Sequence, residues 1–419
     1  MRGPASAPLA SVSLASSAAA IALGLAVPLS VASAQELQSP TIALDAPEAL
    51  FVPTPLTLGS ATVEVGGAAR IEYDSNIYAQ AFDEKDDFRA VFRPYAEINR
   101  KGGAIELNAR AEGDFRKYFQ YDSEDAAGGK IGAGLTWTPS ASDKLAAAAS
   151  WQHVIEDRGE PEGNTAPSIG PRELNAWEGD LAYTHQGARV GFMLRGTASR
   201  FRYTRAIDDN RDLDNMGALA RVMLRVSPLM NGFVEGFASQ RDFRRVPQLG
   251  EIDRDSKTYG GRVGIAIDPG GTIRGEAAVG VYRFDPKDSR IDPRTRLSAQ
   301  VGLVYAPRPR TAITLDGFIG NVATYRTGVQ SREDMRFRLG VQQEIRHNLR
   351  GELGLVYRRS KYFGTGLTEK IYGVTGELEY ALNRRMALAA TARFSKRDST
   401  DPLDDYDRTR AGLELRIHY

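Results

Sequence analysis

From about residue 61 to the end of the chain, apolar and polar residues alternate with a period of two. Residues 104–116 place Ile105, Leu107 and Phe115 on one side of an extended backbone, and Glu106 and Arg116 on the other. Successive side chains of a strand point to opposite faces of the sheet. The pattern therefore predicts β-strands with one apolar and one polar face.

Eighteen segments show this pattern, and together they account for most of the region. They are 63–74, 87–99, 104–116, 129–138, 143–154, 174–184, 188–200, 215–226, 231–241, 257–267, 272–283, 295–306, 311–321, 334–345, 349–359, 370–381, 386–396 and 408–419. Two segments fit less well. Pro94 cannot donate to a strand ladder, which predicts a bulge or a shifted register there. In 231–241, Phe233 and Phe237 share a face with Glu235, so the orientation of this strand stays open.

The connections between these segments alternate between short and long. Tight turns such as 100–103 and 346–348 are followed by longer polar stretches such as 156–173 and 397–407. Short periplasmic turns and long extracellular loops are typical of antiparallel transmembrane β-barrels. We therefore predict an all-β fold, an antiparallel transmembrane barrel of about 18 strands, with 16 as the alternative count.

Aromatic residues lie near the ends of the predicted strands on the apolar face. Trp137, Tyr305 and Tyr380 lie near short turns, and Trp151 and Tyr357 near long loops. Lipid interfaces select two such belts, whereas the apolar face of a soluble β-sandwich is a core without a preferred aromatic position. The last segment ends on an aromatic residue, and its apolar side resembles the C-terminal signal read by the barrel-assembly machinery, through Leu413, Leu415, Ile417 and Tyr419.

The first 34 residues differ from the rest of the chain. Arg2 is their only charge, an apolar stretch follows, and Ala32-Ser33-Ala34 closes the segment. This predicts a secretory signal peptide (1–34) that is cleaved after Ala34. Residues 35–60 contain four prolines and read as a periplasmic linker before the barrel at 61–419. The expected location is the outer membrane of a Gram-negative bacterium, in contact with membrane lipid and lipopolysaccharide.

Composition excludes several other classes. Charged residues make up 26% of the chain and the mean hydropathy is −0.36, which excludes a bundle of apolar transmembrane helices. Lys and Arg number 54 and Asp and Glu 53, so the removal of Arg2 leaves 53 of each sign. This balance gives no support to nucleic-acid binding. The chain has no cysteine, which excludes disulfides and thiolate metal sites.

The polar face must line water or protein, because charges that face lipid are strongly unfavourable. Arginines and carboxylates alternate along this face, and the candidate pore-lining residues are Arg93, Arg110, Glu112, Arg221, Arg225, Arg262, Arg274, Glu276, Arg296, Arg336, Arg338, Glu352, Glu377 and Arg393. They would either create a field across a channel or form lateral ion pairs that stiffen the wall. For a single arginine the second interpretation is favoured, and for the lumen as a whole the first.

The sequence offers little catalytic chemistry. None of its four histidines is expected to share a strand level with a Ser or Asp partner on the polar face, and no hydrolase, metalloprotease or phosphate-loop motif occurs. We therefore predict no enzyme, no cofactor and no metal site, although acidic outer loops leave divalent-cation binding open. A TonB-dependent receptor is not expected, because only about 26 residues lie between the predicted cleavage site and the barrel.

Residues 61–419 resemble the Putative beta-barrel porin 2 family of proteobacterial outer-membrane proteins. The resemblance opens with Ala69-Arg-Ile-Glu-Tyr-Asp-Ser-Asn-Ile-Tyr78. It implies an outer-membrane barrel and a role in the passage of polysaccharide, with export components as partners. The family offers no catalytic residues to transfer.

Two functional hypotheses follow. The first is an outer-membrane channel for polar solutes, in the service of polysaccharide export. The second is a non-conducting structural or adhesion barrel, whose lumen is closed by its Arg/Glu network or by an infolded loop, with residues 156–173 as the candidate constriction.

Overall fold

The computed structural model describes residues 44, 55–163, 169–245, 250–267, 271–326 and 328–419. The predicted signal peptide with its cleavage site, and most of the predicted linker, lie outside the described residues. Three short 3-10 helices, η1 (Asp122–Glu124), η2 (Ala206–Arg211) and η3 (Pro402–Asp404), lie in loops. Among the described residues, no helix is long and apolar enough to cross a membrane.

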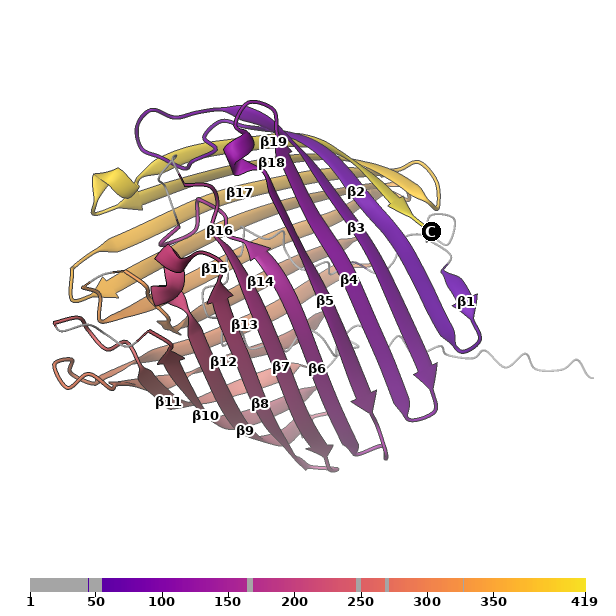
Figure 1. Cartoon of the computed structure of the whole chain (residues 1–419). Coiled ribbons are helices and arrows are strands. Elements are labelled where there is room, and N and C mark those ends of the chain that lie inside the picture. Colours follow the sequence, from indigo (N-terminus) through magenta and orange to yellow (C-terminus); the bar gives the residue numbers. More distant parts are fainter. Residues whose placement is uncertain (1–43, 45–54, 164–168, 246–249, 268–270, 327) are drawn as a thin grey trace, which may run out of the picture.

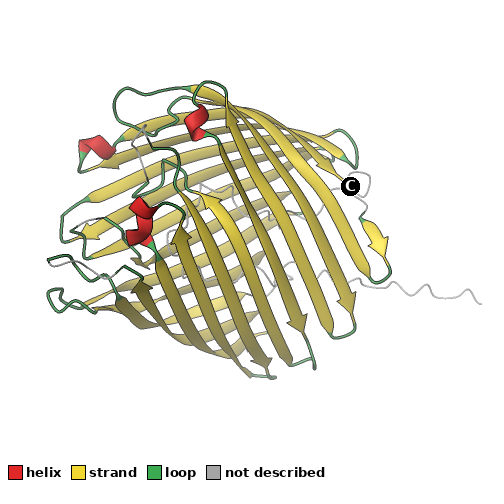
Figure 2. Cartoon of the chain, viewed as in Figure 1, coloured by secondary structure: helices red, strands yellow, loops and turns green. Residues whose placement is uncertain are grey.

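The described chain forms one antiparallel sheet that closes on itself (Figures 1 and 2). Its strands are β1 (Leu56–Leu58), β2 (Ala61–Asp74), β3 (Asp87–Gly102), β4 (Ile105–Tyr118), β5 (Ala126–Trp137), β6 (Asp143–Ile155), β7 (Glu173–Gln186), β8 (Val190–Tyr203), β9 (Leu213–Ser227), β10 (Met230–Phe243), β11 (Ser256–Ile267), β12 (Ile273–Pro286), β13 (Arg294–Arg308), β14 (Thr311–Val322), β15 (Ser331–Arg346), β16 (Leu349–Phe363), β17 (Thr368–Ala381), β18 (Met386–Ser399) and β19 (Tyr406–His418).

The ring closes where β19 pairs antiparallel with β2, with Leu413 opposite Ile71. The Tyr419 amide donates to the Val65 carbonyl oxygen over 2.7 Å, and the Val65 amide donates back over 3.0 Å. Strands β2 to β19 thus form the predicted barrel of 18 strands rather than 16. The short strand β1 pairs only with β2 and was not predicted, since it lies in the segment assigned to the linker.

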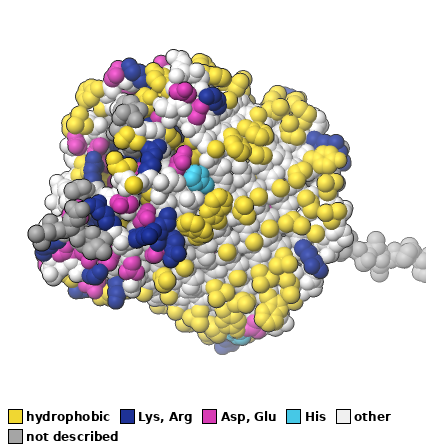
Figure 3. Space-filling model, viewed as in Figure 1, with side chains coloured by type: hydrophobic (Ala, Val, Ile, Leu, Met, Phe, Trp, Pro, Cys, Tyr) yellow, Lys and Arg dark blue, Asp and Glu magenta, His cyan; other side chains and the backbone are white. Residues whose placement is uncertain are grey.

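The two faces of the wall follow the predicted alternation. Apolar side chains point outward, as for Leu413, which is 72% exposed in the isolated chain. Figure 3 shows hydrophobic side chains over the strand wall, while charged side chains gather at the end with the long loops. Because long loops are typically extracellular, we call this end extracellular and the opposite end periplasmic. Outward aromatic residues pair across strands near the extracellular end, as do Tyr357 and Tyr372, whose ring centroids lie 5.4 Å apart.

The two doubtful strands are resolved differently. At Pro94 the pairing of β3 with β4 is interrupted between Phe92 and Tyr95, but the register is the same on both sides, so the interruption involves no shift. Strand β10 keeps Glu235 on the inner, buried face together with Phe233. The adjacent inner-face position on β11 is Gly264, where a Cβ atom would lie 2.4 Å from the Phe233 ring. Glycine therefore makes room for an aromatic ring inside the wall.

Candidate functional site

The part of the β6–β7 loop that follows β6 enters the barrel. We call its residues 156–163 the inlet loop. Its Asp157 lies 3.0 Å from Arg408 and 2.7 Å from Arg410 on β19, and Glu160 lies 2.8 Å from Arg358 on β16. In a ring of eighteen strands, β15 and β16 lie about opposite β6. The inlet loop therefore crosses the lumen and is held by the far wall.

The backbone of the inlet loop is also bound. One Nη atom of Arg397 donates to the carbonyl oxygens of Gly159 and Glu160, each over 2.7 Å. The Tyr406 hydroxyl donates to the Gly159 carbonyl oxygen over 2.9 Å. A Cβ atom at position 159 would lie only 2.8 Å from that hydroxyl oxygen, so the contact favours glycine.

Glu162, near the end of the inlet loop, contacts the wall at β15 and at the residues that follow β14. Its carboxylate accepts from the Tyr325 amide over 2.6 Å and from the Thr324 hydroxyl over 2.8 Å, and pairs with Arg332 of β15 over 3.0 Å. Near the start of the loop, the Arg158 guanidinium bonds to both oxygens of Glu124 in η1. Both ends of the inlet loop are therefore fixed by charge-assisted hydrogen bonds, which are stronger than neutral ones.

Burial changes the acidity of the loop carboxyls. Removal from water raises the pKa of Glu160 to about 7, although Arg358 and Arg397 favour its ionised form. Burial likewise raises the pKa of Glu156, against the opposing effect of Arg211 and Arg172. Desolvation disfavours a charged carboxylate, so both groups hold a proton more tightly here than in water.

All the predicted pore-lining residues lie on strands at positions that face inward. Three of them meet in one buried network on β9 to β12, where Glu235 joins Arg221 to Arg262 and Arg221 also bonds to Glu276. The guanidinium of Arg221 lies 3.9 Å from the Phe233 ring centroid, which explains why an aromatic ring shares this face. Glu235 was missed because the pattern of its strand was ambiguous.

Other predicted residues form smaller contacts. Arg110 bonds to Glu97 and Glu112, and Glu377 pairs with Arg416. The remaining members lie outside these groups. Arg93 pairs with Asp114, Glu352 bonds to Gln342, Arg336 lies over Phe318 and Arg296 over Phe363, while Arg225, Arg274, Arg338 and Arg393 lie along the inner wall. The wall contacts support the ladder interpretation for several of these residues.

The residues that form the main contacts of the inlet loop were not among the predicted pore-lining residues. They are Arg332, Arg358, Arg397, Arg408 and Arg410 on the wall, and Asp157, Glu160 and Glu162 on the loop. The wall arginines share one signal, since each lies at an inward position toward the extracellular end of its strand. The loop carboxylates carry no periodic signal.

A polar cavity borders the inlet loop on the inner side of β2 to β6 and β19. Its volume is about 510 Å³. The charged lining includes Arg93, Arg110, Arg116, Lys130 and Arg416 as well as Glu112, Asp114 and Asp157. This part of the lumen therefore offers both signs of charge to a polar solute. Leu44, from the predicted linker, also reaches the inner wall, where its amide donates to Gln342 Oε1 over 3.3 Å.

His185 and His418 lie toward the periplasmic end of the wall, away from the inlet loop. His185 Nδ1 lies 2.8 Å from Asp143 Oδ1, and the same carboxylate accepts from the Tyr183 hydroxyl, all at the periplasmic rim on the outward side. This pair was not predicted, because it lies on the outward face of the wall and not on the polar face. On the inner face, His418 contacts the Tyr95 hydroxyl over 2.7 Å. Within the described ranges, no group of three or more His, Cys, Asp or Glu is placed to hold a metal ion.

Comparison with protein families identifies the chain. The model of the family Putative beta-barrel porin 2 matches residues 49–419. The chain belongs to this family. Membership and fold together place it among outer-membrane β-barrel proteins of the porin kind. A comparison with curated proteins gave no match.

Solved structures similar to this porin-family chain are outer-membrane receptors and transporters. The FrpB iron transporter from Neisseria meningitidis (F5-1 variant) is 9% identical, with a TM-score of 0.44 over 85% of this chain and 82% of that chain. The siderophore receptor PirA from Acinetobacter baumannii is 8% identical, with a TM-score of 0.42 over 85% of this chain and 80% of that chain.

Proposed function

We propose that this member of the porin family is an outer-membrane channel for polar solutes, and that the inlet loop is its constriction. The observation that carries the proposal is the path of the loop, which crosses the lumen and is held by side chains of β15, β16, β18 and β19. A barrel of this size encloses an aqueous channel unless something fills it. The loop narrows that channel. The charged cavity of about 510 Å³ beside the loop provides a polar route for solutes.

A polysaccharide chain is the more specific candidate for the transported solute. The family resemblance supports it, and the lumen adds aromatic and polar contacts, such as Tyr95 beside Arg110, whose guanidinium lies 4.4 Å from the ring centroid. Liposome-swelling rates with neutral oligosaccharides of increasing length test this point. Uptake that falls to zero above a monosaccharide would reject polysaccharide as the solute and leave the channel for small molecules.

The alternative function is a closed structural barrel. The extent and burial of the loop contacts favour it, because an ion-paired plug of this kind could block passage altogether. The two functions make opposite predictions for the conductance of the native protein.

Single-channel recording in planar bilayers separates them. The native protein should give small, stable steps, and a variant with Asp157→Asn and Glu162→Gln should give larger ones, because its loop loses charges that hold it. Asp209→Asn, at an exposed position of η2, is the matched control and should conduct as the native protein does. Silence from both the native protein and the double variant, each shown to be folded by heat-modifiable gel migration, would establish the closed barrel instead.

A further inference from the structure

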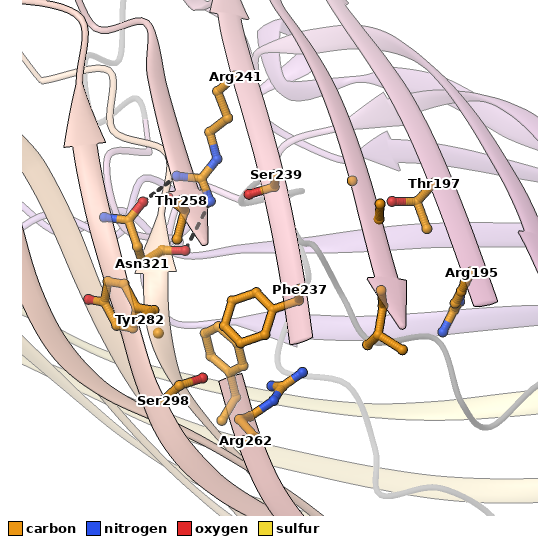
Figure 4. Close-up of a pocket in the computed structure, with 15 residues that line it drawn as sticks. Arg195, Thr197, Phe237, Ser239, Arg241, Thr258, Arg262, Tyr282, Ser298 and Asn321 are labelled. Carbon is orange, nitrogen blue, oxygen red and sulfur yellow. Dashed lines mark hydrogen bonds between the residues drawn. The ribbon is translucent and has the colours of Figure 1, made fainter. Parts of the chain in front are cut away.

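A second cavity lies in the lumen wall, away from the charged cavity and apart from the inlet loop's own contacts. It is formed by β8 to β14 toward their extracellular ends, and Figure 4 shows its labelled side chains. Its volume of about 60 Å³ holds roughly four to six water molecules at about 10–15 Å³ each. The space therefore suits a small polar group rather than a whole sugar chain.

The charged residues that line this cavity are all cationic. Three arginines, Arg195, Arg241 and Arg262, are among its fifteen residues, and none of the fifteen is Asp or Glu. Arg195 bonds to Asp180 and Arg262 to Glu235, so their charges are compensated from outside the cavity. The excess charge of the cavity therefore resides on Arg241.

Arg241 lies in an unusual environment for a buried cation. Its side chain belongs to a residue that is only 6% exposed. Among the described residues it donates only to Asn321, to the side-chain oxygen and, over 3.0 Å, to the carbonyl oxygen. In the part of the chain that the structure describes, no carboxylate pairs with it. A guanidinium has five N–H donors, so three of them remain for another partner.

Two other buried arginines of the lumen contrast with Arg241, whereas Arg397, which is 2% exposed, likewise bonds to carbonyl oxygens. Arg332 and Arg408 are as deeply buried, and each is paired with two carboxylates, as in the pairs of Arg408 with Asp74 and Asp157. A buried charge without a counter-charge is strongly unfavourable, and the penalty is relieved when an anion binds. The environment of Arg241 therefore selects for an anionic ligand.

The remaining lining defines the chemistry of that ligand. The hydroxyls of Ser239, Thr258 and Ser298 line the cavity and have no hydrogen-bond partner among the described residues. Phe237 and Phe318 add apolar ring surface. A planar guanidinium and hydroxyl groups on the lining of one cavity match the hydrogen-bonding chemistry of a carboxylate.

We propose that this cavity binds the carboxylate group of a small organic acid, with Arg241 as its counter-ion. The proposal deepens the proposed channel function, because it names anionic carboxylates as solutes that the lumen retains. A role of this site in transport rests on the proposed channel function. Binding of the carboxylate does not depend on it.

Calorimetric titration of the folded protein in detergent, at pH 7 and low chloride, tests the proposal. Sodium glucuronate and sodium acetate are two sources of the same carboxylate group, and glucose is the neutral control. We expect a Kd in the millimolar range for at least one of the two acids and no binding of glucose. A response to glucuronate alone would identify sugar acids as the source, and a response to acetate would show that the carboxylate suffices.

Variants locate the site. Arg241→Gln should weaken binding about tenfold or more, since a hydrogen bond to a charged group is lost. Arg200→Gln removes an arginine from the exposed extracellular rim and should leave binding unchanged. If Arg241→Gln does not fold, the paired substitution Thr258→Val and Ser298→Ala keeps the charge and should still weaken binding severalfold.

Three results would overturn the proposal: no binding of either acid to the native protein, equal binding of glucose, or unchanged binding by the folded Arg241 or hydroxyl variants. The outcome is separable from that of the bilayer recordings. Binding in a protein that does not conduct would keep the site and reject the channel, and conductance without binding would do the reverse.

Discussion

Both ends of the lumen contain ion pairs of arginine with a carboxylate, but the pairs differ in their exposure to water. At the extracellular end, Arg332 and Asp334 have side chains that are 0% exposed, because the inlet loop covers them. Toward the periplasmic end, the side chains of Arg110 and Glu97 are 46% and 28% exposed, although they too form an ion pair. The alternation along the strands places both pairs inside the barrel, but only the extracellular pair is removed from water.

This difference decides what the ion pairs contribute. Exposed pairs are screened by water and contribute little to stability. Buried pairs are costly to form, yet the removal of one partner is strongly destabilising because the other charge stays buried. By burying the ion pairs at the extracellular end, the inlet loop makes each of their partners important for stability. The substitutions and the pH change below test this difference between the two ends.

The largest effect is expected for Arg408→Ala. Arg408 pairs with Asp74 over 2.6 Å and with Asp157 over 3.0 Å, so its loss leaves two buried carboxylates without this partner. The free energy of unfolding should fall by about 3–5 kcal/mol. Urea unfolding in lipid vesicles, followed by tryptophan fluorescence, measures it. A loss below about 1 kcal/mol would mean that water reaches the extracellular end and that the contrast is wrong.

A smaller effect is expected from pH. The pKa of Glu160 is about 7 in the buried loop and near 4.5 in water, so the buried position favours the protonated form. The stabilisation of the seated loop is therefore complete below pH 4.5 and is lost as pH rises through about 7, by up to about 3 kcal/mol. The raised pKa of Glu156 acts in the same direction.

Conductance recorded between pH 5 and pH 8 measures this weakening as an increase in the open-channel step. Glu160→Gln cannot ionise and should flatten the dependence. Identical pH profiles for the native protein and Glu160→Gln would show that this carboxyl does not control the seating of the loop.

The smallest effect is expected for Arg110→Ala at the periplasmic end. Arg110 bonds to Glu97 and Glu112 in a water-exposed setting, so its removal should change the free energy of unfolding by about 1 kcal/mol or less. The same urea titration applies. A loss comparable to that of Arg408→Ala would remove the distinction between the two ends.

The strand wall could be predicted from the sequence because lipid enforces one rule along every strand. An outward charge is so unfavourable that alternation persists even where single residues depart from it, as at Pro94. All eighteen predicted segments correspond to β2 to β19. The short strand β1 was missed because Leu56–Leu58 contains no sustained alternation.

The anchors of the inlet loop could not be predicted in the same way. The sequence indicated 156–173 as a candidate constriction, but the partners of the loop depend on contacts across the lumen. Glu160 and Arg358 are 198 residues apart, and no local period links them. Glu235 shows the same limit on a smaller scale, since its inward orientation depends on Arg221 and Arg262 of neighbouring strands.

The position of Asp157 has a consequence for the order of assembly. Asp157 contacts Arg408 and Arg410 of β19, and Arg408 also pairs with Asp74 of β2, 334 residues away. These contacts lie at the seam where the last strand meets the first strand of the ring. Contacts between such distant parts of a chain form late, because a large loop must close first. The inlet loop thus acquires its contacts with β19 only when this strand pairs with β2. In a barrel that has not yet closed, these contacts of the loop are absent.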